Sequence, residues 1–430
     1  MAGMKQAGLR RQLHQLLRRS LKFLPTSSRF ALYRRMIDCD PRPDPRLELK
    51  VADNKEELEG CFRILHDAYV ASGFMRPDPS GMRVTIYHAL PTTTTLCAKV
   101  DGVPVGTISM IREGVFGFPL QSVFDLSSVR AQEGNIAEIS ALAVHPDYRK
   151  TGGTILFPLM KFMYEYCTRF FDTRHLVIAV NPDRIELYES LLFFRRLQEN
   201  TVDRYDFANG APAVGATLDL KHAPAIFERV YGRRSLRKNL FRYFVQTRLP
   251  NINLPKRRYF TTNDPVMTPA LLDHFFNQAT RVLESLDDRK RMLLRSIYDL
   301  PEYAQLLPTV RAAGPADNPL RRHKRYSIRC PAVVAFAAGD APQRPALHVV
   351  EISLLGFQAE SKVTLPLDVD GAATVELGEH ETSEVIVRAV RRRTTEFGEF
   401  YGFMLHRPDA IWRRCVLALE QGQTSADLVR

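Results

Sequence analysis

A short loop of basic and small residues lies between a predicted strand and a predicted helix. Residues 149–154 read Arg-Lys-Thr-Gly-Gly-Thr, and apolar side chains at helical spacing begin at Ile155. The free N–H groups of a helix start attract anions, and the two glycines allow the backbone to approach a ligand closely. An ordinary basic turn would have the same composition. The residues predicted to bind phosphate are Arg149, Lys150, Gly152, Gly153 and Thr154.

A carboxylate stands in the strand that leads to this loop. Residues 137–144 read Ala-Glu-Ile-Ser-Ala-Leu-Ala-Val, and we expect the strand to end at His145-Pro146 because proline cannot donate to a strand ladder. Burial would raise the pKa of Glu138 and suit it to accept a proton from an attacking nucleophile. Glu138 is therefore the candidate general base, directly or through water. A structural salt bridge is its alternative role.

Further strands and helices are expected around this segment. Strands are predicted at residues 47–51, 94–100, 105–111 and 176–179. Asp101-Gly102 is a tight-turn dipeptide between two of them. Asn54 can cap a helix that follows the first strand, and another helix is expected after Asn181-Pro182.

The loop and its strand resemble the GNAT acyltransferase superfamily. Its pyrophosphate loop has the pattern Arg/Gln-x-x-Gly-x-Gly/Ala, which Arg149 and Gly152 match, whereas Thr154 stands where Gly or Ala is usual. Residues 80–91, followed by a Gly-Thr strand and by residues 137–144, are similar to the N-acyl amino acid synthases (FeeM-like enzymes). The resemblance implies an α+β fold, with a mixed, mostly antiparallel sheet flanked by helices and followed by a helical extension.

The same resemblance implies a reaction. Enzymes of this branch transfer a long-chain fatty acyl group from a thioester, on acyl carrier protein or coenzyme A, to the amine of an amino acid. By resemblance, Tyr188 is the acid that protonates the leaving thiolate, and packing alone is its alternative role. The backbone N–H groups of Leu142, Ala143 and Val144 would polarise the thioester carbonyl.

Other residues are candidates for contacts with the two substrates. Arg83 is the candidate for binding the acceptor's carboxylate, because arginine pairs with carboxylates through a planar fork. Phe116, Phe118 and Phe124 are candidates either for lining an acyl tunnel or for plain core packing.

The C-terminal region contains two motifs. The first stands just before a strand-like stretch, and the second follows it. Arg321 and Arg325 are separated by three residues, and Glu351, Ser353 and Gly356 come later. Paired arginines can hold phosphates and stack on guanine, while an acidic side chain can accept from the guanine edge. Short alternating strands over residues 363–406, with turns expected at 370–371 and 397–398, predict a small barrel.

These motifs resemble the Arg-x-x-x-Arg and Asp/Asn-x-Ser-x-x-Gly motifs of PilZ domains, the bacterial receptors for cyclic di-GMP, with Glu351 in the Asp/Asn place. The resemblance implies a six-stranded β-barrel. A barrel that no longer binds nucleotide is the alternative. The implied cyclic di-GMP-binding residues are Arg321, Arg322, Arg325, Glu351, Ser353 and Gly356.

The net charge of +12 favours acidic partners. Acyl carrier protein is the acidic partner that the resemblance implies, and Arg233–Arg258 is either its docking face or a solvated basic linker. Lys5–Leu24 can form a basic amphipathic helix, which would lie on an anionic membrane surface or pack on its own domain.

Several classes are disfavoured by composition. No apolar run is long enough to span a membrane, and the first residues lack the pattern of a secretory signal. The six cysteines are scattered, which fits small buried apolar residues and a reducing cytoplasm. We therefore expect a cytoplasmic protein, with peripheral binding to the inner face of the membrane as an alternative, and neither a metal nor a covalently bound cofactor.

The 430 residues are expected to form several units. These are a basic N-terminal segment (1–45), an acyltransferase domain (46–232), a basic linker with a helical hairpin (233–312) and a PilZ domain (318–425). The hypothesis is an N-acyltransferase regulated by cyclic di-GMP. The alternatives are a non-catalytic cyclic di-GMP effector that binds a protein or membrane partner, and a nucleic-acid binder, although no sequence-specific nucleic-acid-binding motif is present.

Overall fold

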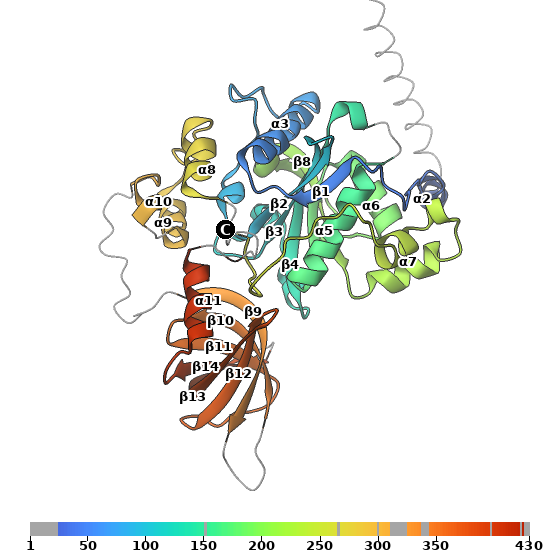
Figure 1. The fold of residues 1–430 in the computed structure, drawn as a ribbon. Helices are drawn as coiled ribbons and strands as arrows, with labels where there is room; N and C mark the ends of the chain where they lie inside the picture. Colours follow the sequence, from blue (N-terminus) through green and yellow to red (C-terminus); the bar gives the residue numbers. More distant parts are fainter. Residues whose placement is uncertain are drawn as a thin grey trace, which may run out of the picture.

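Two β structures dominate the fold, an open eight-stranded sheet and a closed six-stranded barrel (Figure 1). The computed structural model describes residues 25–149, 153–264, 267–298, 301–309, 325–336, 344–395, 398–421 and 424. The helix predicted for Lys5–Leu24 lies outside the described residues. Among those described, no helix has the length and apolar character needed to cross a membrane.

The open sheet has the order β1-β2-β3-β4-β5-β8-β6, with β7 also pairing with β8. Only the pairing of β4 with β5 is parallel, which confirms the prediction of a mixed, mostly antiparallel sheet. The turn at Asp101-Gly102 has positive φ at both residues, as tight hairpins require. The strands are β1 (Leu47–Val51), β2 (Thr93–Val100), β3 (Val103–Arg112), β4 (Asn135–Val144), β5 (Thr173–Val180), β6 (Arg195–Arg196), β7 (Val202–Tyr205) and β8 (Ala211–Asp219).

Helices α3 (Lys55–Ala71) and α5 (Leu156–Phe170) cover opposite faces of this sheet. Leu96 of β2 shares a core cluster with α5, and its neighbour Cys97 shares one with α3, because successive strand side chains point to opposite faces. The predicted cap of α3 is confirmed, since the Asn54 side chain accepts from the N–H of Glu57. All six cysteines are buried and free of disulfide bonds.

Smaller helices complete this unit. Helix α2 (Thr26–Arg35) packs on α6 (Pro182–Leu192), and α7 (Ala223–Tyr231) and the short α4 (Ser127–Arg130) lie elsewhere around the sheet. Part of the basic segment also packs here, since Leu240 and Tyr243 are buried in the same core cluster as α5.

The expected helical extension is present beside α3. It comprises α8 (Pro269–Asp273), a π-helical turn (His274–Gln278), α9 (Asp288–Ile297) and α10 (Pro301–Ala304). Thr268 and Asp287 cap α8 and α9 with their side chains, as their positions predict. Phe275 packs edge-on against Phe62 of α3, with ring centroids 5.2 Å apart.

The barrel confirms the predicted six-stranded architecture. Its strands close in the order β10-β11-β14-β13-β12-β9. Helix α11 (Ala410–Glu420) covers it through the buried Trp412, whose indole N–H donates to the Ser353 carbonyl at 3.0 Å. The strands are β9 (Arg325–Phe336), β10 (Ala346–Ser353), β11 (Gly356–Ser361), β12 (Asp370–Gly378), β13 (Glu381–Thr395) and β14 (Gly398–Leu405).

One extended segment joins the two structures. Arg257 enters the sheet unit, where it pairs with the largely buried Asp264, whose carboxylate also accepts from the hydroxyl of Tyr166 at 2.8 Å. Arg258 pairs with Glu381 of the barrel at 2.7 Å, and Tyr259 belongs to the barrel core. Burial alone would raise the pKa of Asp264, but the nearby guanidinium groups outweigh it and lower this pKa.

Asp264→Ala should destabilise the protein strongly. It would leave Arg257 and Arg112 buried without their carboxylate, and such losses cost roughly 3–5 kcal/mol. Urea denaturation followed by circular dichroism would measure the loss. The matched control is Glu133→Ala, which removes an exposed carboxylate 3.4 Å from Arg174 and should cost less than about 1 kcal/mol. Equal effects of the two substitutions would contradict the expectation.

Candidate active site

Strands β4 and β5 separate in the middle of the sheet. Their parallel register runs from Asn135 paired with Thr173 to Glu138 paired with Val177, although the two strands continue to Val144 and Val180. Beyond Glu138, Ala141 has a left-handed φ of 55° and the pairing with β3 shifts register. The divergence leaves room for a ligand between two strands that would otherwise be bonded.

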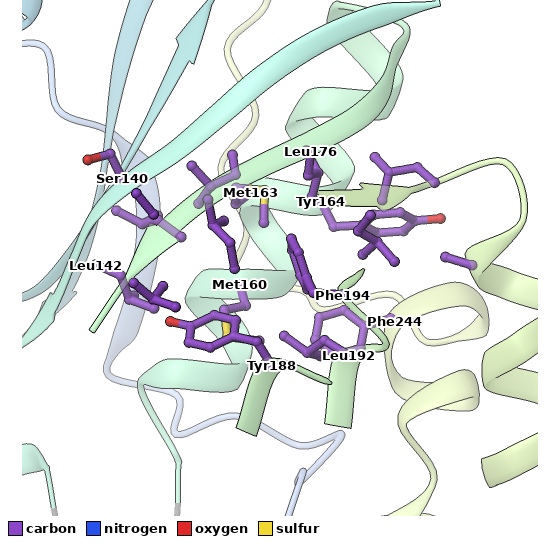
Figure 2. Close-up of a pocket in the computed structure, with 18 of the residues that line it drawn as sticks. Ser140, Leu142, Met160, Met163, Tyr164, Leu176, Tyr188, Leu192, Phe194 and Phe244 are labelled. Atoms are coloured by element: carbon purple, nitrogen blue, oxygen red, sulfur yellow. The ribbon is translucent and has the colours of Figure 1, made fainter. Parts of the chain in front are cut away.

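An apolar cavity of about 200 Å³ lies at this separation. Figure 2 shows the Tyr188 hydroxyl on the side of the cavity that Leu142 of β4 lines. Such a cavity suits an alkyl chain rather than a polar substrate. Further lining side chains come from β5, α5, the end of α6 and the segment after it: Met160, Met163, Leu176, Ile178, Leu192 and Phe194.

Phe116, Phe118 and Phe124 do not line this cavity. Phe118 and Phe124 are buried in a different core cluster with Val177, on the face of the sheet opposite α5. Phe116 lines a second cavity, between the sheet and the barrel. None of the three therefore lines this cavity, and core packing, their alternative role, is observed for Phe118 and Phe124.

Tyr188 reaches the cavity from α6. Asn181 caps this helix and Pro182 occupies its first turn. The Tyr188 ring packs edge-on against Phe194 at 5.9 Å, and burial raises the pKa of its hydroxyl. The hydroxyl thus keeps its proton at neutral pH and can donate it.

Glu138 lies at the point of separation, on the face opposite α5. Only 2% of it is exposed, and one carboxylate oxygen accepts from the N–H of Leu120 at 3.0 Å. Burial raises its pKa to about 8. No cation forms an ion pair with it among the described residues, so the salt-bridge alternative is not observed there.

Arg83 is a buried cation close to the cavity. Its guanidinium donates to the Phe207 carbonyl at 2.6 Å and lies 4.0 Å from the ring centre of Tyr69, which itself lines the cavity. Among the described residues no carboxylate pairs with Arg83. A buried guanidinium without an acidic partner is suited to an anionic ligand.

Tyr87 and Tyr205 extend this polar region. Both rings contact Phe207, at 5.6 and 5.8 Å. Burial and the neighbouring Glu138 carboxylate raise the pKa of Tyr87 to about 12 and also raise that of Tyr205. The Tyr205 hydroxyl is buried with no hydrogen-bond partner among the described residues. Arg83 and Glu138 therefore border one region, because these tyrosines lie close to both. Nothing in the sequence had indicated that Tyr87 or Tyr205 would belong to the site.

The predicted phosphate loop is described in part. Lys150 and Gly152 lie outside the described residues. Arg149 is exposed and donates to the Val144 carbonyl at 2.6 Å, and Thr154 is exposed as well. Gly153 has a φ of 89°, and a Cβ there would lie 2.6 Å from the Phe157 ring, so glycine is required.

The three residues predicted to polarise the carbonyl all lie on β4 beyond its pairing with β5. Leu142 lines the cavity, while Ala143 and Val144 pair with Thr107 and Gly106 of β3. Their role as donors stays a prediction.

The barrel brings its motif residues together at the start of β9 and the β10–β11 turn. Arg325 pairs with Glu351 at 2.7 Å, and the Ser353 hydroxyl donates to the Gly356 carbonyl at 3.0 Å. A Cβ at Gly356 would lie 2.6 Å from the Phe403 carbonyl oxygen. Arg321 and Arg322 lie outside the described residues.

Comparison with known proteins supports the expected family for part of the chain. Residues 60–219 match the family model of the N-acyl amino acid synthase FeeM. This match agrees with the resemblance to N-acyl amino acid synthases over these residues. No curated protein sequence matches the chain significantly.

Similar solved structures cover either the sheet unit or the barrel. FeeM, an N-acyl amino acid synthase from uncultured soil microbes, is 23% identical over 42% of this chain and 95% of its own, with a TM-score of 0.37. The acyl-homoserine lactone synthase BjaI, solved with SAM and isopentyl-CoA, is 20% identical over 44% of this chain and 91% of its own, with a TM-score of 0.33. The PilZ domain of YcgR from Escherichia coli, solved with c-di-GMP, is 13% identical over 24% of this chain and 94% of its own, with a TM-score of 0.21.

Glu138→Gln should stabilise the protein at neutral and alkaline pH. Between pH 4.5 and about 8 the unfolded chain releases the Glu138 proton while the folded protein retains it, so stability falls as pH rises through this range. Glutamine can still accept from Leu120 and carries no such penalty. The expected gain is roughly 2–4 kcal/mol at pH 7, shrinking to nothing near pH 4. Urea midpoints at both pH values would measure it, and a pH-independent difference would contradict the assignment.

Proposed function

We propose that this protein transfers a long-chain fatty acyl group from a thioester to the amine of an amino acid, and that cyclic di-GMP at the barrel regulates the transfer. The proposal rests on three features near the point where β4 and β5 separate: a cavity at the separation, Glu138 at the last paired position, and Arg83 against Tyr69, which lines the cavity. They are, in turn, an apolar cavity, a buried carboxyl of raised pKa and a buried guanidinium without an acidic partner. Together they fit an acyl chain, a proton acceptor and a carboxylate.

The reaction follows from these positions. The acyl chain occupies the apolar cavity, and its thioester carbonyl lies between β4 and β5. The acceptor amine attacks this carbon, and Glu138 takes the proton that the nitrogen releases. Backbone N–H groups of Leu142, Ala143 and Val144 stabilise the oxyanion of the tetrahedral intermediate. As the C–S bond breaks, Tyr188 donates its proton to the leaving thiolate.

Arg83 selects acceptors that carry a carboxylate. A planar guanidinium can bind a carboxylate through two parallel hydrogen bonds. The Tyr69 and Phe207 rings, 4.0 and 5.2 Å from the guanidinium carbon, hold it in place and exclude water. An α-amino acid bound in this way would present its amine between Arg83 and the cavity.

The donor's phosphate groups would be bound at the loop 149–154. Exposed arginines at Arg233, Arg242 and Arg248 support acyl carrier protein as the docking partner, although coenzyme A would use the same loop. In the barrel, Arg325, Glu351, Ser353 and Gly356 would bind cyclic di-GMP together with Arg321 and Arg322. For the N-terminal segment, contact with an anionic membrane remains part of the proposal.

Glu138→Gln should abolish formation of the product. Cells that overproduce the wild-type protein should accumulate an N-acyl amino acid, detected by mass spectrometry of extracted lipids, and cells with the variant should not. In vitro, kcat/KM of the wild type should rise with pH towards about 8, because the base must first lose its proton. An unchanged product in the Glu138→Gln variant would refute the role of Glu138. A wild-type protein that makes no product at any cyclic di-GMP level would favour the non-catalytic effector.

Arg83→Gln should weaken acceptor binding selectively. Losing a charge-assisted pair should raise the KM for the amino acid about 10- to 100-fold, with the KM for the acyl donor unchanged. The probe is an amine that matches the amino acid but lacks the carboxylate. The wild type and the variant should use this amine equally poorly. Arg204→Gln is the control, because Arg204 is exposed and pairs with Asp206 at the surface. A rise in KM for both acceptors alike would indicate a structural role only.

A further inference from the structure

A second cavity, of about 870 Å³, lies between the barrel and the rest of the protein. Its walls come from β9 and the end of α11, from the ends of β3 and β4, and from the helical extension. Figure 1 shows β9 and α11 on the side of the barrel that faces the sheet and α9. The volume is within the range of ordinary ligand sites.

Two arginines of β9 line this cavity. Arg325 and Arg329 are four residues apart on one strand, so their side chains project from the same face. Each pairs with one carboxylate, Arg325 with Glu351 and Arg329 with Asp172 of the sheet unit at 2.8 Å. Only Arg325 belongs to the sequence motif of the barrel, so the structure adds Arg329 to the same surface.

The opposite wall supplies groups of a different kind. It includes the aromatic residues Phe116 and Tyr298 and the acidic residue Glu302 of α10. Flat rings stack on aromatic side chains, and a carboxylate accepts from the N–H groups of a guanine edge. The cavity thus has phosphate-binding cations on the barrel side and base-binding groups on the other side.

We propose that this cavity between the two structures is the binding site of the cyclic dinucleotide, and that Arg329 exchanges Asp172 for a phosphate of the ligand. This inference rests on the proposed binding of cyclic di-GMP by the barrel and specifies where and with what residues it occurs. The exchange is favourable because the Arg329–Asp172 pair is weak. The Asp172 side chain is 71% exposed, and exposed ion pairs contribute little stability.

Breaking this pair would act on the acyltransferase site. Asp172 stands in the turn between α5 and β5, with a left-handed φ of 46°. These two elements supply Met160, Met163 and Leu176 to the apolar cavity. A ligand that removes Arg329 from this turn would therefore release one contact between the barrel and the elements that enclose the acyl chain.

Calorimetric titration of the full-length protein with cyclic di-GMP would test the site. Arg329→Ala should weaken binding about tenfold, as expected for a lost charge-assisted contact. Asp172→Asn should instead tighten it, because it removes the carboxylate that competes with the phosphate. The matched control is Arg393→Ala, an exposed arginine of β13 outside the cavity, which should leave the affinity unchanged.

The two substitutions together distinguish a lost contact from misfolding. An Asp172→Asn variant that binds more tightly must be folded, so the expected result cannot arise from unfolding. Wild-type affinity in both variants, with binding lost in Arg325→Ala, would overturn the site between the two structures while leaving nucleotide binding by the barrel intact. Absence of binding by the wild type would overturn the regulatory part of the proposed function itself, and this inference with it.

Discussion

The candidate site depends on the loss of pairing between two neighbouring strands. Everywhere else in the open sheet, adjacent strands are antiparallel, whereas β4 and β5 are parallel and their register stops at Glu138. Backbone N–H and C=O groups beyond this point face a cavity with apolar walls, where unpaired polar groups are costly. A substrate carbonyl between the strands would restore the missing hydrogen bonds. The separation therefore leaves backbone groups beside an apolar pocket, which is the arrangement that the proposed acyl thioester requires.

The two buried ionisable groups near this groove are kept apart from each other. If Arg83 paired with Glu138, the guanidinium would lower the pKa of the carboxyl, but burial instead raises that pKa to about 8. Arg83 is held by a carbonyl oxygen and two aromatic rings. The charged form of each group is less stabilised in this arrangement than it would be in an ion pair. Such local conflicts mark functional sites, because each group remains available for a ligand.

Much of this structure could be predicted from local sequence patterns. Asn54 caps a helix where the sequence places it, and β4 ends before Pro146 as expected. These features depend on neighbours in the chain. The prediction of a turn at Asp370-Gly371 is wrong, since both residues belong to β12 and pair with β13. Gly371 is needed there because a Cβ would lie 2.8 Å from Val334 of β9, a contact between strands that a dipeptide does not encode.

Contacts between distant segments set the limit of prediction at the site. Tyr69 and Phe207 surround Arg83 only after α3 and the segment before β8 come together, and nothing in their local sequence indicates it. Phe118 and Phe124 were plausible tunnel residues by composition, yet they lie on the face of the sheet opposite α5. The Arg329–Asp172 pair likewise joins residues far apart in the chain.

The connection between sheet and barrel combines a strong contact with a weak one. Arg257 and Arg258 are adjacent in the chain, yet Arg257 pairs within the sheet unit and Arg258 pairs with the barrel. The buried pair of Arg257 with Asp264 reaches α5 through Tyr166, and it is costly to break. The exposed pair of Arg329 with Asp172 lies at the turn between α5 and β5, and its partners are easily exchanged. A ligand can therefore alter the second contact while the first keeps the barrel attached, which confines its effect to the turn between α5 and β5.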